Sequence, residues 1–72
     1  MDTRYMKELT THDLLWLACR ARADNVCGGT QHSRQIEREA QHELIARSEP
    51  DSILGLHARA GSYHAAYNFI TG

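Results

Sequence analysis

The sequence is poor in most of the residue types that mark specialised protein classes. It holds two cysteines, one proline, one tryptophan and one phenylalanine. Two cysteines are too few for a small secreted scaffold held together by disulfides, so we expect a reduced, cytoplasmic protein. The net charge is −1, so the chain lacks the excess of basic residues that is typical of a nucleic-acid-binding domain. This lack of positive charge argues against nucleic acid as the main partner.

Long hydrophobic runs are also missing. The longest apolar run covers residues 14–19, whereas a membrane-spanning helix needs about 20 apolar residues. Residues 1–13 carry acidic and polar side chains where a secretory leader would need an apolar segment. We therefore expect neither a membrane span nor a leader in this sequence.

What is present is enough for one folded unit. Apolar residues make up 42% of the 72 positions, a fraction too high for a disordered chain. We expect a single helical domain over residues 1–72. Residues 1–8 either stay loose or extend the first helix and lay Tyr5 and Met6 on the core.

The first helix is predicted over residues 10–24. Thr10 and Asp13 have the spacing of a capping box, in which a threonine side chain accepts a bond from the helix backbone. Leu9 and Leu14 can close a hydrophobic staple around this cap. Asn25 is the expected left-handed residue that ends the helix, and the glycine pair after it marks a loop.

Two further helices are predicted over residues 31–47 and 49–70. The second begins at Thr30 or Ser33, and the third at a cap formed by Ser48 and Asp51. The third helix carries a long apolar stripe at alternating steps of three and four, formed by Ile53, Leu56, Ala60, Tyr63, Tyr67 and Ile70. Because the preceding turn is short, the expected fold is an all-α, small three-helix bundle whose long C-terminal helix forms an antiparallel hairpin with helix 2.

Candidate chemistry gathers around the glycine loop. Cys27 and Arg34 have a spacing that loosely resembles the Cys-x5-Arg phosphate loop of cysteine phosphatases, but the sequence has one residue too many. A Cys/His metal site is a second possibility, because zinc is bound by such side chains; its ligands would be Cys19, Cys27, His32 and His42. None of these spacings has the tight pairs that preorganise zinc. We expect a non-catalytic protein without a metal or cofactor.

Arginine supplies nearly all of the positive charge, and this permits two binding modes. Arg34, Arg38 and Arg59 could line a nucleic-acid-binding face, although glutamates at 37, 39 and 43 lie among them and weaken the field that attracts phosphate. The alternative is a protein interface, in which arginine pairs with acidic groups of a partner.

The protein interface is the preferred prediction. Trp16 and Arg20 lie one helical turn apart, away from the apolar stripe of their helix, and both types are enriched at binding hot spots. The last turns of the chain carry more large side chains than helix 2 can cover. The predicted interface therefore consists of Trp16, Arg20, Tyr63, Tyr67, Phe69 and Ile70. Trp16 would belong to the core instead if the N-terminal segment covered it.

The expected function is that of an inhibitor, adaptor or regulator that occupies the surface of another protein. The C-terminal helix could also pair with a second copy, because uncovered apolar surface in so small a chain favours association. Accessory proteins of phages and mobile elements are often of this size, which makes them the expected class.

Overall fold

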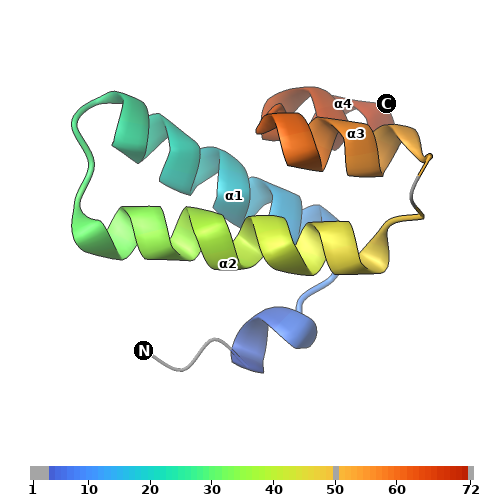
Figure 1. Cartoon of the computed structure of the whole chain (residues 1–72), viewed down its shortest axis with the longest axis horizontal. Coiled ribbons are helices and arrows are strands. Elements are labelled where there is room, and N and C mark those ends of the chain that lie inside the picture. The colour runs from blue at the N-terminus through green and yellow to red at the C-terminus, as the bar shows by residue number, and fades with distance from the viewer. Residues whose placement is uncertain (1–3, 50, 72) are drawn as a thin grey trace.

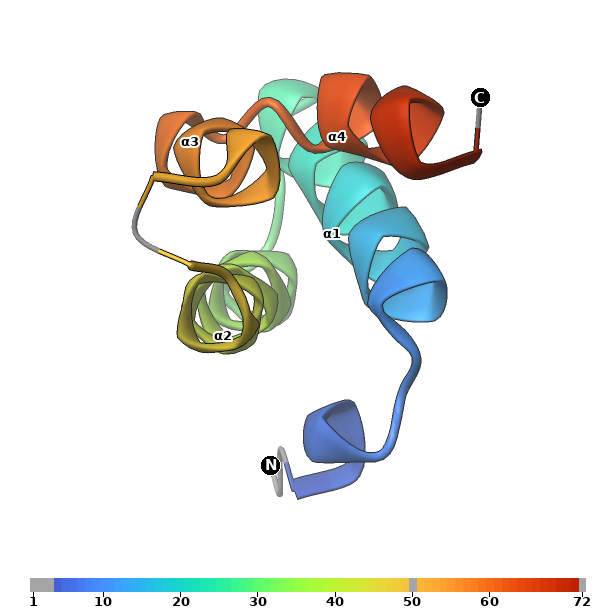
Figure 2. The ribbon, with the colours of Figure 1, turned by 90° about the vertical axis from the view of Figure 1, so that its right-hand side faces the viewer.

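The computed structural model describes residues 4–49 and 51–71, and this part of the chain contains helices and no strand. A short 3₁₀ helix, η1 (Arg4–Lys7), precedes four α-helices: α1 (Thr11–Val26), α2 (Gln31–Arg47), α3 (Ile53–Ala60) and α4 (Tyr63–Thr71). Helices α1 and α2 make the most extensive contact. Helices α3 and α4 lie together against one side of that pair (Figures 1 and 2). The all-α fold class predicted from the sequence is therefore confirmed.

Three helices begin at side-chain caps, which explains where the chain enters each of them. Thr10 accepts a hydrogen bond from the Asp13 backbone N–H at 3.1 Å, as the sequence predicts. Thr30 does the same for Ser33 at 3.1 Å, and Ser52 for Gly55 at 3.0 Å. Each cap satisfies a backbone N–H that has no partner inside its helix. Of the two predicted starts for the second helix, Thr30 is the one used.

The predicted end of the first helix is wrong. Helix α1 continues through Asn25 to Val26, and no described residue other than glycine has a positive φ. The chain turns at Gly28 and Gly29 instead, whose φ angles are 115° and 56°. Asn25 is held in the helix because its side-chain amide donates to Glu37 across the turn, at 2.9 Å.

The predicted long C-terminal helix is also wrong, because the segment divides into α3 and α4. Gly61 ends α3 in the left-handed conformation at φ 77°, and α4 begins after Ser62. Ser48 does not start the third helix: it caps the C-terminus of α2, and its hydroxyl donates to the Leu44 carbonyl at 2.6 Å. Ser52 caps α3 in its place. Pro50, which the sequence pattern places in the first turn of the predicted third helix, lies outside the described residues.

This division sends the predicted apolar stripe in two directions. Ile53 and Leu56 are 48% and 57% exposed, whereas Leu54 packs on the core and Ala58 is fully buried. Helix α3 therefore turns Leu54 and Ala58 toward the core, and both lie outside the predicted stripe. Helix α3 runs back along α2, and α4 lies over α1 (Figure 2).

The core is small and rich in alanine. One fully buried alanine comes from each α-helix: Ala18, Ala40, Ala58 and Ala66. Larger side chains fill the space around them, namely Met6, Leu14, Leu15, Leu44 and Tyr63. Because a methyl group is the only side chain at each of the four alanines, the helices can approach closely there.

Helix η1 lies on the side of α2 opposite to α3 and α4 (Figure 1). Met6 is 2% exposed, as expected if this segment lies on the core. Arg47 of α2 donates to the backbone carbonyls of Met6 and Lys7, at 2.9 and 3.1 Å. The same guanidinium pairs with Glu43 at 3.0 Å, so one side chain joins η1 to α2.

Candidate protein-binding surface

Trp16 and Arg20 lie on the outer face of α1, one turn apart. The indole of Trp16 is 52% exposed, and the guanidinium carbon of Arg20 lies 5.0 Å from the ring centroid. This distance is that of a cation–π contact. In the described part of the chain, η1 contacts α2 and leaves the indole of Trp16 half exposed. The two side chains therefore form a preorganised aromatic and cationic pair at the surface.

A groove of about 450 Å³ lies between α1 and α4 beside this pair. Its α1 wall is made by Trp16, Cys19, Arg20 and Ala23, and its α4 wall by His64 and Tyr67. The α1 residues follow the i, i+3, i+4, i+7 spacing of one helical face. Among the described residues, no carboxylate lines the groove, and Arg20 gives it a positive charge.

Tyr67 is held in place by a neighbouring ring. The centroid of His12 lies 4.7 Å from that of Tyr67, with the planes tilted by 43°. Because Tyr67 is half-buried and packs against the core, its ring is a fixed part of the groove wall. The contact with His12, near the start of α1, also shows that α4 runs antiparallel to α1.

The groove thiol is not activated. Burial raises the pKa of Cys19, which keeps the sulfur protonated and weakly nucleophilic. Cys27 is exposed, and both cysteines are free. Within residues 4–49 and 51–71, no group of three His, Cys, Asp or Glu side chains comes close enough to hold a metal ion. The cysteines and histidines of the predicted metal site therefore do not converge on a common point in this part of the chain.

The six predicted interface residues lie in three different places in the structure. Trp16, Arg20 and Tyr67 come together at the groove. Phe69 and Ile70 are 57% and 39% exposed near the end of α4, outside the groove lining. Tyr63 is 1% exposed and packs in the core, so the prediction that it lies at an interface is wrong. Its burial follows from the break before it, which turns the first residue of α4 inward.

Some exposed apolar residues were missed by the sequence analysis. Ile53 and Leu56 were placed on the buried stripe, and Val26, which is 75% exposed, was placed in a loop. The Gly61–Ser62 pair could have indicated that Ile53 and Leu56 are solvent-exposed. It is a glycine followed by a residue type that often precedes a helix. A helix break there removes the reason to bury Ile53 and Leu56 with Tyr63.

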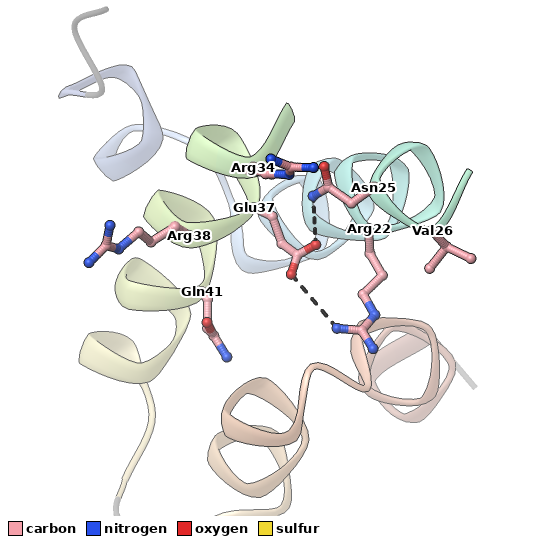
Figure 3. A pocket seen from close by; sticks show the side chains of 7 residues that line it. All are labelled: Arg22, Asn25, Val26, Arg34, Glu37, Arg38 and Gln41. Atoms are coloured by element: carbon pink, nitrogen blue, oxygen red, sulfur yellow. Dashed lines mark hydrogen bonds and ion pairs between the residues drawn. The ribbon is translucent and has the colours of Figure 1, made fainter. Parts of the chain in front are cut away.

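A polar cluster joins α1 to α2 on another side of the molecule (Figure 3). Glu37 accepts a hydrogen bond from Asn25 at 2.9 Å and lies 3.7 Å from the guanidinium of Arg22. Asn25 also donates to the Ser33 carbonyl at 3.4 Å, and the Ser33 hydroxyl donates to Asp24. This cluster fixes the α1–α2 turn, and the Glu37 carboxylate balances part of the charge of Arg22.

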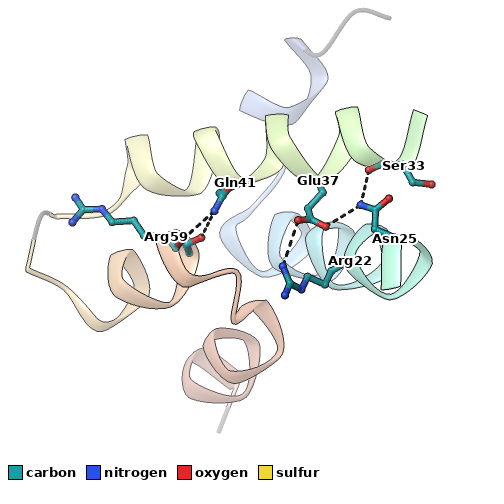
Figure 4. Close-up of polar contacts among 7 residues, drawn as sticks. Arg22, Asn25, Ser33, Glu37, Gln41 and Arg59 are labelled. Carbon is teal, nitrogen blue, oxygen red and sulfur yellow. Dashed lines mark hydrogen bonds and ion pairs between the residues drawn. The ribbon is translucent and has the colours of Figure 1, made fainter. Parts of the chain in front are cut away.

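Of the arginines that could have formed a nucleic-acid-binding face, Arg34 and Arg38 line one hollow, and Arg59 is not among its lining residues. Figure 3 shows the guanidinium groups of Arg34 and Arg38 on separate sides of the hollow beside Glu37. Arg59 lies at the end of α3, where Gln41 donates to the carbonyl of Ala58 at 2.8 Å (Figure 4). This hydrogen bond ties α3 to α2.

The comparisons with known proteins give no relative: no family model, no curated protein and no solved structure matches this chain. Among the described residues, no helix is both long enough and apolar enough to cross a membrane.

Proposed function

We propose that this chain is a small non-catalytic protein that binds another protein and acts on it as an inhibitor, adaptor or regulator. The observation that carries the proposal is the half-exposed indole of Trp16, with Arg20 against its face and the α1–α4 groove beside it. Exposed tryptophan and arginine in one cluster are typical of binding hot spots. The two free cysteines favour a reducing compartment such as the cytoplasm.

The preorganisation of this pair supports binding in energetic terms. A flexible side chain loses about 0.5–1.5 kcal/mol of free energy when an interface immobilises it. The contact between Arg20 and Trp16 already restricts both side chains in the free protein. A partner that covers the indole would therefore gain apolar burial at a reduced entropic cost.

Trp16→Ala tests the proposal directly. The variant should remain folded, because an indole that is 52% exposed contributes little to the core. Binding to the partner should weaken by about 2 kcal/mol, or about thirtyfold. The measurement is capture of proteins from the native cell extract, combined with a melting curve of the variant.

Val26→Ala is the matched control, because Val26 is exposed at the far end of α1. A protein captured by the wild type and by Val26→Ala, but lost by Trp16→Ala, supports the proposal. Retention by Trp16→Ala, or no specific capture by the wild type, contradicts it.

A second proposal concerns self-association through the C-terminal helix. Phe69 and Ile70 are exposed near the end of α4 without a partner among the described residues. Such side chains favour pairing with another apolar surface. A homodimer through α4 would cover them.

A further inference from the structure

The α1 wall of the α1–α4 groove is long enough to lie beside about two turns of a helix. Its α1 wall runs from Trp16 to Ala23, which corresponds to about 10 Å at 1.5 Å per residue. The groove continues into a second hollow of about 340 Å³, because Cys19, Ala23 and His64 line both. Together they form a trough along two antiparallel helices. An amphipathic helix is a common occupant of such a groove.

The charge of the residues that line the trough indicates which charge a partner helix should carry. Among the residues that the structure describes, no carboxylate lines either hollow, whereas Arg20 lines the outer one and Arg22 the inner one. Arg22 is partly balanced by Glu37 at 3.7 Å. Within the described part of the chain, Arg20 has no ion pair. A partner with a carboxylate at this point would supply the missing opposite charge.

The positions of Trp16 and Arg20 fix how far apart the partner's groups should be. One turn of α1 separates the two residues, and one turn of a partner helix separates residues three or four apart. We infer that the α1–α4 groove binds an acidic amphipathic helix of a partner protein, which seats an apolar side chain between Trp16 and Tyr67 and pairs a carboxylate with Arg20. This inference rests on the proposed protein-binding function and adds the chemistry of the partner.

Designed helical peptides test this charge preference. Three peptides share one apolar stripe and carry Glu, Gln or Lys one turn from the central anchor. Trp16 is the only tryptophan of the chain, so its fluorescence reports binding at the groove directly. The Glu peptide should bind at least tenfold more tightly than the Gln peptide, and the Lys peptide most weakly. Added salt should reduce the difference between the peptides.

Arg20→Glu gives the decisive comparison. Arg20 is exposed, so the variant should fold, and its preference should reverse in favour of the Lys peptide. Arg38→Glu is the control: Arg38 is exposed on α2 outside the groove, and this variant should keep the preference for Glu.

Three results would overturn the inference. One is equal affinity for the three peptides, and another is a preference for Glu that survives in Arg20→Glu. The third is a Trp16 signal that responds to a single-stranded oligonucleotide but to none of the peptides. The first two leave the protein-binding proposal intact, because capture by the wild type and by Trp16→Ala decides that proposal separately.

Discussion

At the scale of single residues, Tyr63 combines a well-buried ring with a buried polar hydroxyl. It is 1% exposed, and its hydroxyl has no hydrogen-bond partner in the described part of the chain. Burial and, to a lesser degree, the charge of Glu37 raise the pKa of Tyr63 to about 12. A buried polar group without a partner costs about 1–3 kcal/mol. The ring stabilises the core while the hydroxyl weakens it.

Tyr63→Phe should therefore leave the free energy of unfolding at neutral pH unchanged or raise it by about 1 kcal/mol. The wild type should also lose stability above pH 10, because the unfolded chain ionises Tyr63 near pH 10 and the folded chain only near pH 12. The loss should reach about 2 kcal/mol by pH 12. Urea unfolding at several pH values measures both effects.

Tyr67→Phe is the control for this comparison, because Tyr67 is only half-buried. It should keep the alkaline loss of stability that Tyr63→Phe removes. A clear destabilisation of Tyr63→Phe at neutral pH would show that the hydroxyl has a partner after all.

At the scale of the helices, the break at Gly61 decides how the second half of the chain packs. The glycine has φ 77°, and an added Cβ would lie 2.8 Å from a guanidinium nitrogen of Arg22. A residue with a side chain is strained in this backbone conformation. The break buries Tyr63, exposes Leu56 and brings α4 onto α1.

Gly61→Ala separates the broken helix from the continuous one by the sign of its effect. In a continuous helix over residues 49–70, alanine would stabilise the protein by about 1 kcal/mol relative to glycine. With Gly61 in the left-handed conformation, we expect alanine to destabilise it by about 1 kcal/mol or more. Thermal or urea unfolding of the variant gives the sign.

Ala60→Gly is the companion variant, since Ala60 is exposed in the last turn of α3. It should lower stability by at most about 1 kcal/mol. If the Gly61→Ala variant is more stable than the wild type, the result supports a continuous helix over residues 49–70 and contradicts the break at Gly61.

The sequence was informative where local chemistry decides the structure. The capping box of Thr10 and Asp13 predicts its helix start correctly, because it depends on residues three positions apart. For the second helix the sequence left Thr30 and Ser33 as alternative starts, and Thr30 is the cap. The division of the last segment was missed because its apolar spacing of three and four continues across Gly61. Whether Tyr63 or Leu56 is buried depends on how α4 meets α1. The spacing within one segment does not contain that information.

In the candidate site, too, local sequence patterns predict one part and tertiary packing decides the other. Trp16 and Arg20 could be paired from their spacing alone, because one turn of helix joins them. Tyr67 could be placed beside them only by tertiary packing, and His64 of the groove was not anticipated at all. Local sequence thus indicates the hot spot, while the fold supplies the opposite wall.

At the scale of the whole molecule, the chain leaves a large share of its bulky apolar residues uncovered. Six are exposed in the described part: Trp16, Val26, Ile53, Leu56, Phe69 and Ile70. A stable dimer usually buries about 600–1,000 Å² per partner, against a total surface of 4766 Å² for the described chain. Self-association would therefore cover a substantial part of the molecule.

Replacement of Phe69 and Ile70 by serine should reduce the association proposed for α4. We expect the wild type to show a mass that rises with concentration in sedimentation equilibrium, and the double variant to remain monomeric. At low concentration the melting temperatures should be similar, because both side chains are exposed. Val26→Ser should associate like the wild type, and a wild type that is monomeric at every concentration would contradict the proposal.

The four buried alanines carry a consequence for how this protein can change over evolution. Each α-helix contributes one of them to the centre, so a larger group at any of the four would push neighbouring helices apart. Natural variants should therefore retain alanine or an equally small residue at 18, 40, 58 and 66. Drift should concentrate on the outward faces, where new partners can be acquired without rebuilding the interior.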